Sequence, residues 1–268
     1  MYEKDRMSHS QIAKHFGVGR MVVQRWFEKL EIKPRTNGES QTAVNEHRFP
    51  GLNPQQEQLV YGSLLGDACL YLDRFTSNKK TEAKLSKYTL NFAHTNKKAA
   101  YLKHKRDVMG AKVKMKSPLT IGHRTSGHGS TMDCFVFAHK PTLTTVAALV
   151  HNKNHKKSVN QKWLNKLNLH GIAYWYQDDG CIRINKRTGQ RSVIFYTNSF
   201  NMKEQKLLQK LLKKHGLTAI ISKSPNGTPG EFILAAHRQA EVSQFLDKIK
   251  PFIVPCMRYK LRNPGKTI

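Results

Sequence analysis

The chain has 268 residues, and its 46 Lys and Arg residues against 18 Asp and Glu residues give a formal net charge of +28 and a pI near 10.1. A charge of this sign gathers polyanions, so nucleic acid is the expected partner and an anionic membrane surface is the alternative. No stretch approaches the roughly 18 consecutive apolar residues that span a bilayer. The N-terminal sequence MYEKDRMSH lacks the apolar core of a signal peptide, so we expect a cytoplasmic protein.

Cysteine spacing and charge distribution set the domain organisation. The four cysteines, Cys69, Cys134, Cys181 and Cys256, form no C-x-x-C pair and predict reduced core residues rather than a zinc site or disulfides. Residues 1–50 hold nine Lys/Arg and six Asp/Glu, whereas residues 51–268 hold 37 and 12. The length suits one large domain plus a small one, and the larger segment carries most of the positive charge.

The segment SHSQIAKHFGVGRMVVQRWFEKLEI predicts two short helices around a turn at Gly17. The apolar positions that we expect to pack between the helices are Ile12, Ala13, Phe16, Val18, Val23 and Trp26. The pattern resembles the helix-turn-helix family, which implies a DNA-binding domain over residues 1–35 with Arg20, Gln24 and Arg25 facing outward on the recognition helix. An ordinary helical hairpin used for packing is the alternative. Residues 36–53 collect Pro, Gly, Asn and Ser and predict a linker.

From residue 54 onward the helix and strand patterns occur twice in the same order. The first copy has helices over 55–66, 97–109 and 141–151, with strands over 68–72, 84–94 and 132–138. The second has helices over 172–178, 203–215 and 239–249, with strands over 181–184, 192–197, 218–222 and 231–235. Local similarity supports a duplication, since FVFAHKPTLTTVAALV parallels FILAAHRQAEVSQFLDKI. We predict an α+β, αββαββα repeat at 54–155 and a second at 156–268.

Each copy begins with a helix that ends in an acid, LVYGSLLGDA and IAYWYQDDG. Gly62 and Gly66 lie four residues apart on one face, where another helix can approach closely. A helix C-terminus carries partial negative charge, so pairing two acidic ends requires a compensating cation. Mg²⁺ favours one or two carboxylates plus water and phosphate oxygens, which makes Asp67 and Asp179 candidate metal ligands. Solvated helix-end acids are the alternative.

These two motifs resemble those of a single-chain LAGLIDADG homing endonuclease, over roughly residues 52–264. The resemblance implies two saddle-shaped antiparallel sheets related by a pseudo-twofold axis. It also implies catalytic, metal-binding carboxylates at Asp67 and Asp179, with the backbone carbonyls of Gly66 and Asp178 as further ligands. Mg²⁺ is the implied cofactor and Mn²⁺ a plausible substitute. The implied activity is a metal-dependent, staggered double-strand break at a long asymmetric DNA site, which promotes mobility of an intron, an intein or the gene itself.

Two lysines complete the implied active centres. The run PFIVPCMRYKLRNP resembles the end of the yeast mitochondrial intron-encoded branch of the family, which places a catalytic pocket lysine at Lys260. The counterpart in the first copy is Lys157, with Lys156 as the rival. Lysines that only contact phosphates are the alternative interpretation.

The motifs also depart from the family name. The first has Ser63, Leu65 and Ala68 where the name reads Leu, Asp and Gly. The second carries Tyr174, Trp175 and Tyr176, so we expect that small residues cannot pack the helix pair on both sides.

DNA recognition, in this resemblance, belongs to the two sheets. Alternate side chains of a strand face the DNA, which makes Lys84, Lys87, Arg183 and Lys186 candidate contacts. We expect a monomer that binds double-stranded DNA in a nucleoid, with a prokaryotic or phage context favoured over an organelle. Two alternatives remain: an intron RNA maturase, and a non-catalytic regulator that joins a degenerate LAGLIDADG domain to a helix-turn-helix.

Overall fold

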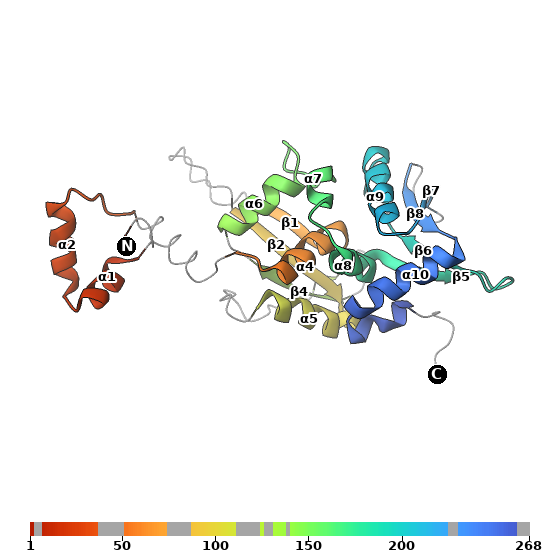
Figure 1. Ribbon diagram of the computed structural model, residues 1–268, viewed down its shortest axis with the longest axis horizontal. Helices are drawn as coiled ribbons and strands as arrows, with labels where there is room; N and C mark the ends of the chain where they lie inside the picture. Colours follow the sequence, from red (N-terminus) through yellow and green to blue (C-terminus); the bar gives the residue numbers. More distant parts are fainter. Residues whose placement is uncertain are drawn as a thin grey trace. The chain divides into compact units, whose positions relative to one another are not determined.

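A computed structural model describes residues 1–2, 7–36, 51–73, 87–110, 124–125, 131–137, 140–224 and 230–261. The chain divides into two compact units, Met1–Gly51 and Leu52–Ile268 (Figure 1). Among the described residues, no helix is long and apolar enough to cross a membrane.

The first unit contains helices α1 (His9–Phe16) and α2 (Arg20–Lys29). Ser8 caps α1 in a reciprocal capping box with Gln11, and Gly17 ends the helix in the left-handed region at φ +65°. Ile12, Ala13, Val23 and Phe27 form the buried cluster between the helices. The predicted helix pair and its turn are therefore present.

Two of the predicted core positions in this unit are wrong. Phe16 and Trp26 are exposed, and their rings stack edge-on with centroids 5.6 Å apart. Phe27 takes the inner position instead, because Val23 and Phe27 are four residues apart and share one face of α2. Arg20, Gln24 and Arg25 are exposed on the same helix.

The second unit repeats αββαββα. The first copy contains α4 (Pro54–Leu65), β1 (Cys69–Asp73), β2 (Lys87–Thr95), α5 (Ala99–Met109), β3 (Arg124–Thr125), β4 (Thr131–Phe137) and α6 (Lys140–Val150). A short α7 (Gln161–Leu164) leads into the second copy. That copy contains α8 (Leu169–Asp179), β5 (Gly180–Ile184), β6 (Arg191–Phe195), α9 (Met202–Lys214), β7 (Ile220–Lys223), β8 (Phe232–Ala236) and α10 (Gln239–Ile249). Two 3-10 segments follow, Lys250–Phe252 and η3 (Pro255–Leu261).

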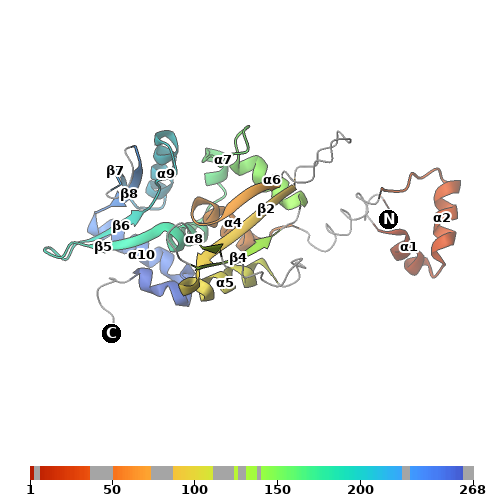
Figure 2. The ribbon, with the colours of Figure 1, turned by 180° about the vertical axis from the view of Figure 1, so that it is seen from behind.

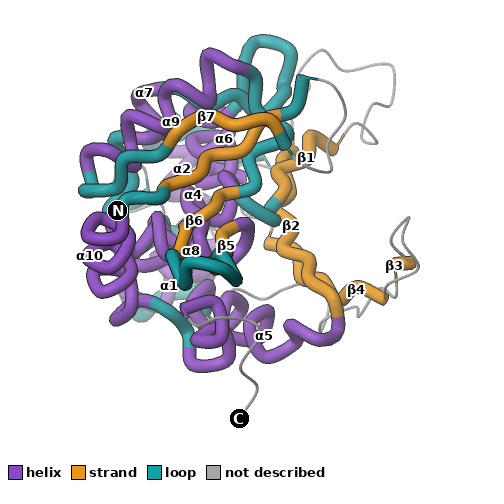
Figure 3. Tube along the Cα trace, turned by 90° about the vertical axis from the view of Figure 1, so that its right-hand side faces the viewer, coloured by secondary structure: helices purple, strands orange, loops and turns teal. Residues whose placement is uncertain are grey.

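Both copies form a four-stranded antiparallel sheet with equivalent strand order, β1-β2-β4-β3 and β5-β6-β8-β7. In each copy, the second residue after the candidate acid pairs with the next strand, Cys69 with Asn91 and Cys181 with Ile194. Figures 1 and 2 show α4 and α8 side by side between the two sheets. Figure 3 shows β2 and β4 running side by side, with α5 close to their ends.

Three details differ from the sequence-based expectations. Strand β3 and helix α7 are short elements that periodicity does not predict, because two to four residues carry too little pattern. The four cysteines are free, but none is a core residue: Cys69 and Cys256 are exposed and the other two are half-buried. In β1, β4 and β5 the alternation places Leu70, Phe135 and Ile182 inward, so the cysteines take the open face.

Candidate active site at the seam between the two copies

Helices α4 and α8 place the two candidate acids. Asn53 and Gln56 form a capping box that starts α4 at Pro54, and the helix ends at Gly66 just before Asp67. Asn168 caps α8, which runs to Asp179 and continues directly into β5. Each acid thus lies where an interface helix ends and the first strand of its sheet begins.

Backbone contact between glycines brings the helices together. A Cβ on Gly62 would lie 2.2 Å from the carbonyl oxygen of Gly171, and one on Gly66 would lie 2.4 Å from Cβ of Asp178. Small residues therefore occur on both helices where they touch, and the expectation based on Tyr174, Trp175 and Tyr176 is wrong. These three side chains are buried on other faces of α8, where Trp175, for example, packs against Phe195.

Asp67 is held as a carboxylate by two basic side chains. Its Oδ2 lies 3.2 Å from Nδ1 of His94 and 3.8 Å from Nζ of Lys98. Burial alone raises the pKa of Asp67, but the hydrogen bond from His94 and the charge of Lys98 outweigh it and hold the pKa at about 2. Asp67 is therefore ionised at neutral pH.

Asp179 has a different electrostatic environment. Burial, together with the negative charges of Asp67 and Asp178, raises the pKa of Asp179 to about 7. In the described part of the chain no side chain forms an ion pair or hydrogen bond with its carboxylate. Burial is the main cause of the raised pKa, and the charges of Lys260 and Lys157 offset only part of it.

The two predicted lysines occupy equivalent places. Lys157 Nζ donates to the carbonyl oxygen of Leu64 at 3.0 Å, and Lys260 Nζ lies 3.5 Å from that of Tyr176. Leu64 and Tyr176 each precede their candidate acid by three residues. Lys156, the rival, is exposed and its side chain has no such contact.

Lys260 also caps the end of α8. Its ammonium group donates to the carbonyl oxygens of Gly180 at 2.9 Å and Asp178 at 3.0 Å. The hydroxyl of Tyr176 donates to the Lys260 carbonyl oxygen at 2.6 Å, which fixes η3 against the helix. Burial, with repulsion from Lys98, lowers the pKa of Lys260 to about 8. The Asp178 carbonyl, a predicted metal ligand, is thus shared with Lys260.

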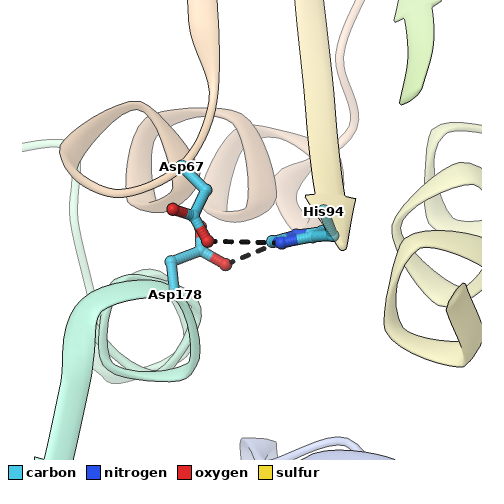
Figure 4. A group of neighbouring side chains, drawn as sticks. All are labelled: Asp67, His94 and Asp178. Atoms are coloured by element: carbon cyan, nitrogen blue, oxygen red, sulfur yellow. Dashed lines mark ion pairs between the residues drawn. The ribbon is translucent and has the colours of Figure 1, made fainter. Parts of the chain in front are cut away.

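The side chain of Asp178 belongs to a buried network rather than to the open site. Lys105 Nζ donates to both carboxylate oxygens, at 2.7 and 2.9 Å, and lies over the ring of Tyr101 at 4.5 Å. Figure 4 shows His94 facing the carboxylates of both Asp67 and Asp178. Its Nε2 lies 3.8 Å from Asp178 Oδ1. These three side chains could coordinate an ion. The Lys105 ammonium already occupies Asp178, so we interpret them as part of a network.

His94 and Lys105 are site residues that the sequence did not indicate. Each lies in an ordinary strand or helix pattern, His94 within KYTLNFAHT and Lys105 within AAYLKHKRDVM. The available signal was polarity at inward-facing positions: His94 follows Tyr88, Leu90 and Phe92 at a spacing of two, so alternation directs it inward.

The predicted DNA contacts on the sheets are only partly described. Arg183 is exposed on β5 and Lys186 is exposed in the hairpin that follows it. Lys87 begins β2, paired with Asp73, but its side chain lies outside the description, and Lys84 lies outside the described residues altogether. Arg183 and Lys186 are therefore the candidate contacts with exposed side chains, on the second sheet and its hairpin.

The donor set suits a hard divalent cation. Two partly accessible carboxylates, Asp67 and Asp179, lie at adjoining helix ends, and the pKa of Asp179 is raised by burial and, second to it, by the charge of Asp67. Carboxylate oxygens with room for water and phosphate oxygens are the ligands that Mg²⁺ prefers. The residues present therefore fit such an ion.

Comparison with known proteins identifies the family. A family model described as the LAGLIDADG DNA endonuclease family matches residues 57–241. Probable intron-encoded endonuclease 1 of Wickerhamomyces canadensis is 29% identical over 216 residues, which cover 78% of this chain and 85% of that protein. Protein RecA of Mycobacterium shimoidei is 27% identical over 218 residues, 78% of this chain. The chain spans about half the length of the RecA proteins that it matches.

A solved structure agrees with the fold. The structure of the homing endonuclease I-WcaI bound to its DNA recognition sequence is 25% identical in sequence and superposes with a TM-score of 0.63. The alignment covers 88% of this chain and 96% of that one. The predicted fold class is confirmed by this match and by the duplicated sheets. Since the family model matches well over half of the sequence, the chain belongs to the LAGLIDADG DNA endonuclease family.

Proposed function

We propose that the protein is a site-specific homing endonuclease that makes a metal-dependent, staggered double-strand break in DNA. One observation carries the proposal: two acid-tipped helices meet at a glycine seam, and in each a lysine ammonium approaches the carbonyl oxygen of the residue three positions before the acid. Two such centres in one chain provide one carboxylate for each DNA strand and make a monomer sufficient. I-WcaI, the related homing endonuclease, is bound to its DNA recognition sequence.

Each centre divides the chemistry among its own residues. Asp67 and Asp179 would hold the metal, with the carbonyls of Gly66 and Asp178 as further donors. Bound Mg²⁺, or Mn²⁺ in its place, supplies Lewis acidity that polarises the scissile phosphate and acidifies water. Lys157 and Lys260 would stabilise the negative charge that develops on the phosphate. The lowered pKa of Lys260, about 8, also makes it suitable for proton exchange with solvent.

Binding would combine the sheets with the small unit. Arg183 and Lys186 would contact DNA from the second sheet, as would Lys84 and Lys87 from the first. Arg20, Gln24 and Arg25 on α2 would add a tethered contact, which raises the effective affinity. The net charge of +28 implies many phosphate contacts and steep weakening by salt. We infer a nucleoid-associated protein in the cytoplasm from this partner.

The test is cleavage of a plasmid that carries the uninterrupted host locus, with Mg²⁺ or with EDTA. Wild-type protein should linearise the plasmid only with Mg²⁺, whereas Asp67→Asn and Asp179→Asn should each abolish linearisation. Arg258→Gln, an exposed change in η3, serves as a surface control. A protein that binds this DNA tightly and never cuts it would instead indicate a regulator, and preference for intron RNA over duplex would indicate a maturase.

A further inference from the structure

The two centres are surrounded by different residues despite their shared backbone plan. Asp67 faces His94, whose side chain is 1% exposed, and Nδ1 lies 3.2 Å from Asp67 Oδ2. A carboxylate oxygen only accepts, so Nδ1 is the donor. Lys98 approaches the same oxygen at 3.8 Å. Both basic groups therefore act on Oδ2, and in the described part of the chain Oδ1 has no hydrogen-bond partner.

The second copy has no equivalent of this histidine. Asn91 pairs with Cys69, and Ile194 pairs with Cys181, which sets the register between the copies. His94 lies three residues after Asn91, and Thr197 lies three residues after Ile194. Thr197 is buried and its hydroxyl donates to Gln205 at 2.8 Å, away from Asp179. The Asp67 centre thus carries an imidazole where the Asp179 centre carries a short hydroxyl.

Lys98 is also specific to the first copy. It is the residue before α5, and Asn201 holds the corresponding place before α9. The Asn201 side chain accepts hydrogen bonds from the backbone of Lys203 and Glu204 as a helix cap. Neither basic neighbour of Asp67 therefore has a counterpart beside Asp179.

The histidine itself is firmly held. It lies one residue before the end of β2, opposite Asp133 of β4, and its ring packs against Tyr101 with centroids 5.0 Å apart. Its Nε2 is 3.8 Å from Asp178 Oδ1, too far for a hydrogen bond. With Nδ1 3.2 Å from Oδ2, the buried imidazole restricts the rotation of the Asp67 carboxylate and leaves Oδ1 for a ligand.

We propose that His94 is a positioning residue for the Asp67 carboxylate alone, so that one strand's cut depends on His94 and the other strand's does not. The inference rests on the proposed endonuclease function. Partners that orient ligating carboxylates typically affect metal affinity or activity about 10- to 100-fold when removed. Loss of His94 should therefore convert the double-strand endonuclease into an enzyme that mainly nicks.

The activity test follows each strand separately on a duplex labelled at both 5′ ends. His94→Leu keeps the packing volume but removes the donor, and should slow one strand's cut about 10-fold or more while the other strand's rate stays within about twofold. His94→Asn places an amide donor near the position of Nδ1 and should restore most of the lost rate. Thr197→Val, the matched change in the second copy, should alter the ratio of the two rates little.

The second test measures metal binding rather than cleavage. The protein is bound to a duplex that cannot be cleaved at the mapped cut positions. Electron paramagnetic resonance then measures the free Mn²⁺ that remains as the ion is titrated into this complex. In the Asp179→Asn background, where Asp67 remains, His94→Leu should weaken Mn²⁺ binding about 10-fold. In the Asp67→Asn background it should change nothing. If His94→Leu does not fold, judged by its unfolding transition, His94→Thr replaces it in both tests.

The outcomes separate the two claims. A wild-type protein that never cuts would contradict the proposed endonuclease function. A wild type that cuts both strands, together with a His94 variant that slows both cuts equally or neither, would overturn the positioning role. Equal loss of Mn²⁺ affinity in both backgrounds would also overturn it.

Discussion

At the residue scale, the two catalytic candidates differ in ionisation. His94 and Lys98 hold the pKa of Asp67 at about 2, whereas burial and neighbouring carboxylates raise that of Asp179 to about 7. The same amino acid at equivalent backbone positions is thus stabilised as an anion in one copy and destabilised in the other. Metal binding at the second centre must release a proton below pH 7, so it should weaken as the pH falls.

This difference predicts opposite effects on stability without metal. Asp179 has a folded pKa above its unfolded value near 3.8, so the folded state binds more protons between pH 4 and 7 and loses stability as the pH rises through that window. Asn cannot ionise, so Asp179→Asn removes this loss of stability. Above pH 7 it should raise the free energy of unfolding on the order of 2 to 4 kcal/mol. The check is urea unfolding in EDTA at pH 5 and pH 8.

Asp67→Asn is the matched control for this measurement. The folded pKa of Asp67 lies below its unfolded value, so its ionised form contributes stability above about pH 4 that is lost as the pH falls toward 2. Asp67→Asn should therefore destabilise the protein at neutral pH, the opposite sign. A stability difference between Asp179→Asn and wild type that is the same at pH 5 and pH 8 would contradict the interpretation.

At the scale of elements, a buried ion pair joins helices from the two copies. Lys105 of α5 and Asp178 of α8 are both 0% exposed at the side chain and lie 2.7 Å apart. Lys105 is the seventh residue of α5, and the seventh residue of α9 in the second copy is Leu208. Asp178 comes just before Asp179, and the residue just before Asp67 in the first copy is Gly66. The second copy therefore has no buried charge at this place.

Breaking the pair from one side should be costly. Lys105→Met leaves the Asp178 carboxylate buried and unpaired, and should lower the free energy of unfolding by about 3 to 5 kcal/mol. Lys105→Leu combined with Asp178→Ala approximates the other copy and should recover most of this loss. Urea denaturation of the single and double variants measures the coupling. A double variant no more stable than Lys105→Met would show that the pair has a further structural role.

At the scale of the whole molecule, the proposed DNA binding draws on net charge and on the two separate units. The small unit presents Arg20, Gln24 and Arg25, and the larger segment carries most of the net charge of +28. A tethered second contact changes affinity without changing the chemistry at the seam. Affinity and cleavage rate should therefore respond to different sets of residues.

Replacing Arg20, Gln24 and Arg25 together by Ala should raise the Kd for target DNA about 10-fold or more, and the salt dependence of binding should become shallower. The single-turnover cleavage rate at saturating protein should stay at the wild-type value. Filter binding over a salt series and cleavage kinetics measure the two quantities. Lys14→Ala on α1 serves as a charge control. An unchanged Kd would show that α2 does not contact this DNA.

The sequence by itself determined the family, the order of elements and the two acid-tipped helices. These features rest on local information: hydrophobic periodicity, helix caps and a nine-residue motif that occurs twice. The ends of most predicted elements lie within two residues of the observed ones, and Gln239–Ile249 is the same in both. The candidate lysine Lys157 came from the family resemblance instead, and its ammonium reaches α4.

Only the tertiary structure decided what surrounds the acids. Gly171 precedes the recognised motif, and its role at the seam depends on how two helices 109 residues apart, Gly62 to Gly171, cross each other. His94 and Lys105 acquire their partners, Asp67 and Asp178, across elements that no local pattern connects. The ionisation of Asp67 and Asp179 depends on burial and on distances between charges, which arise only when the two copies pack together.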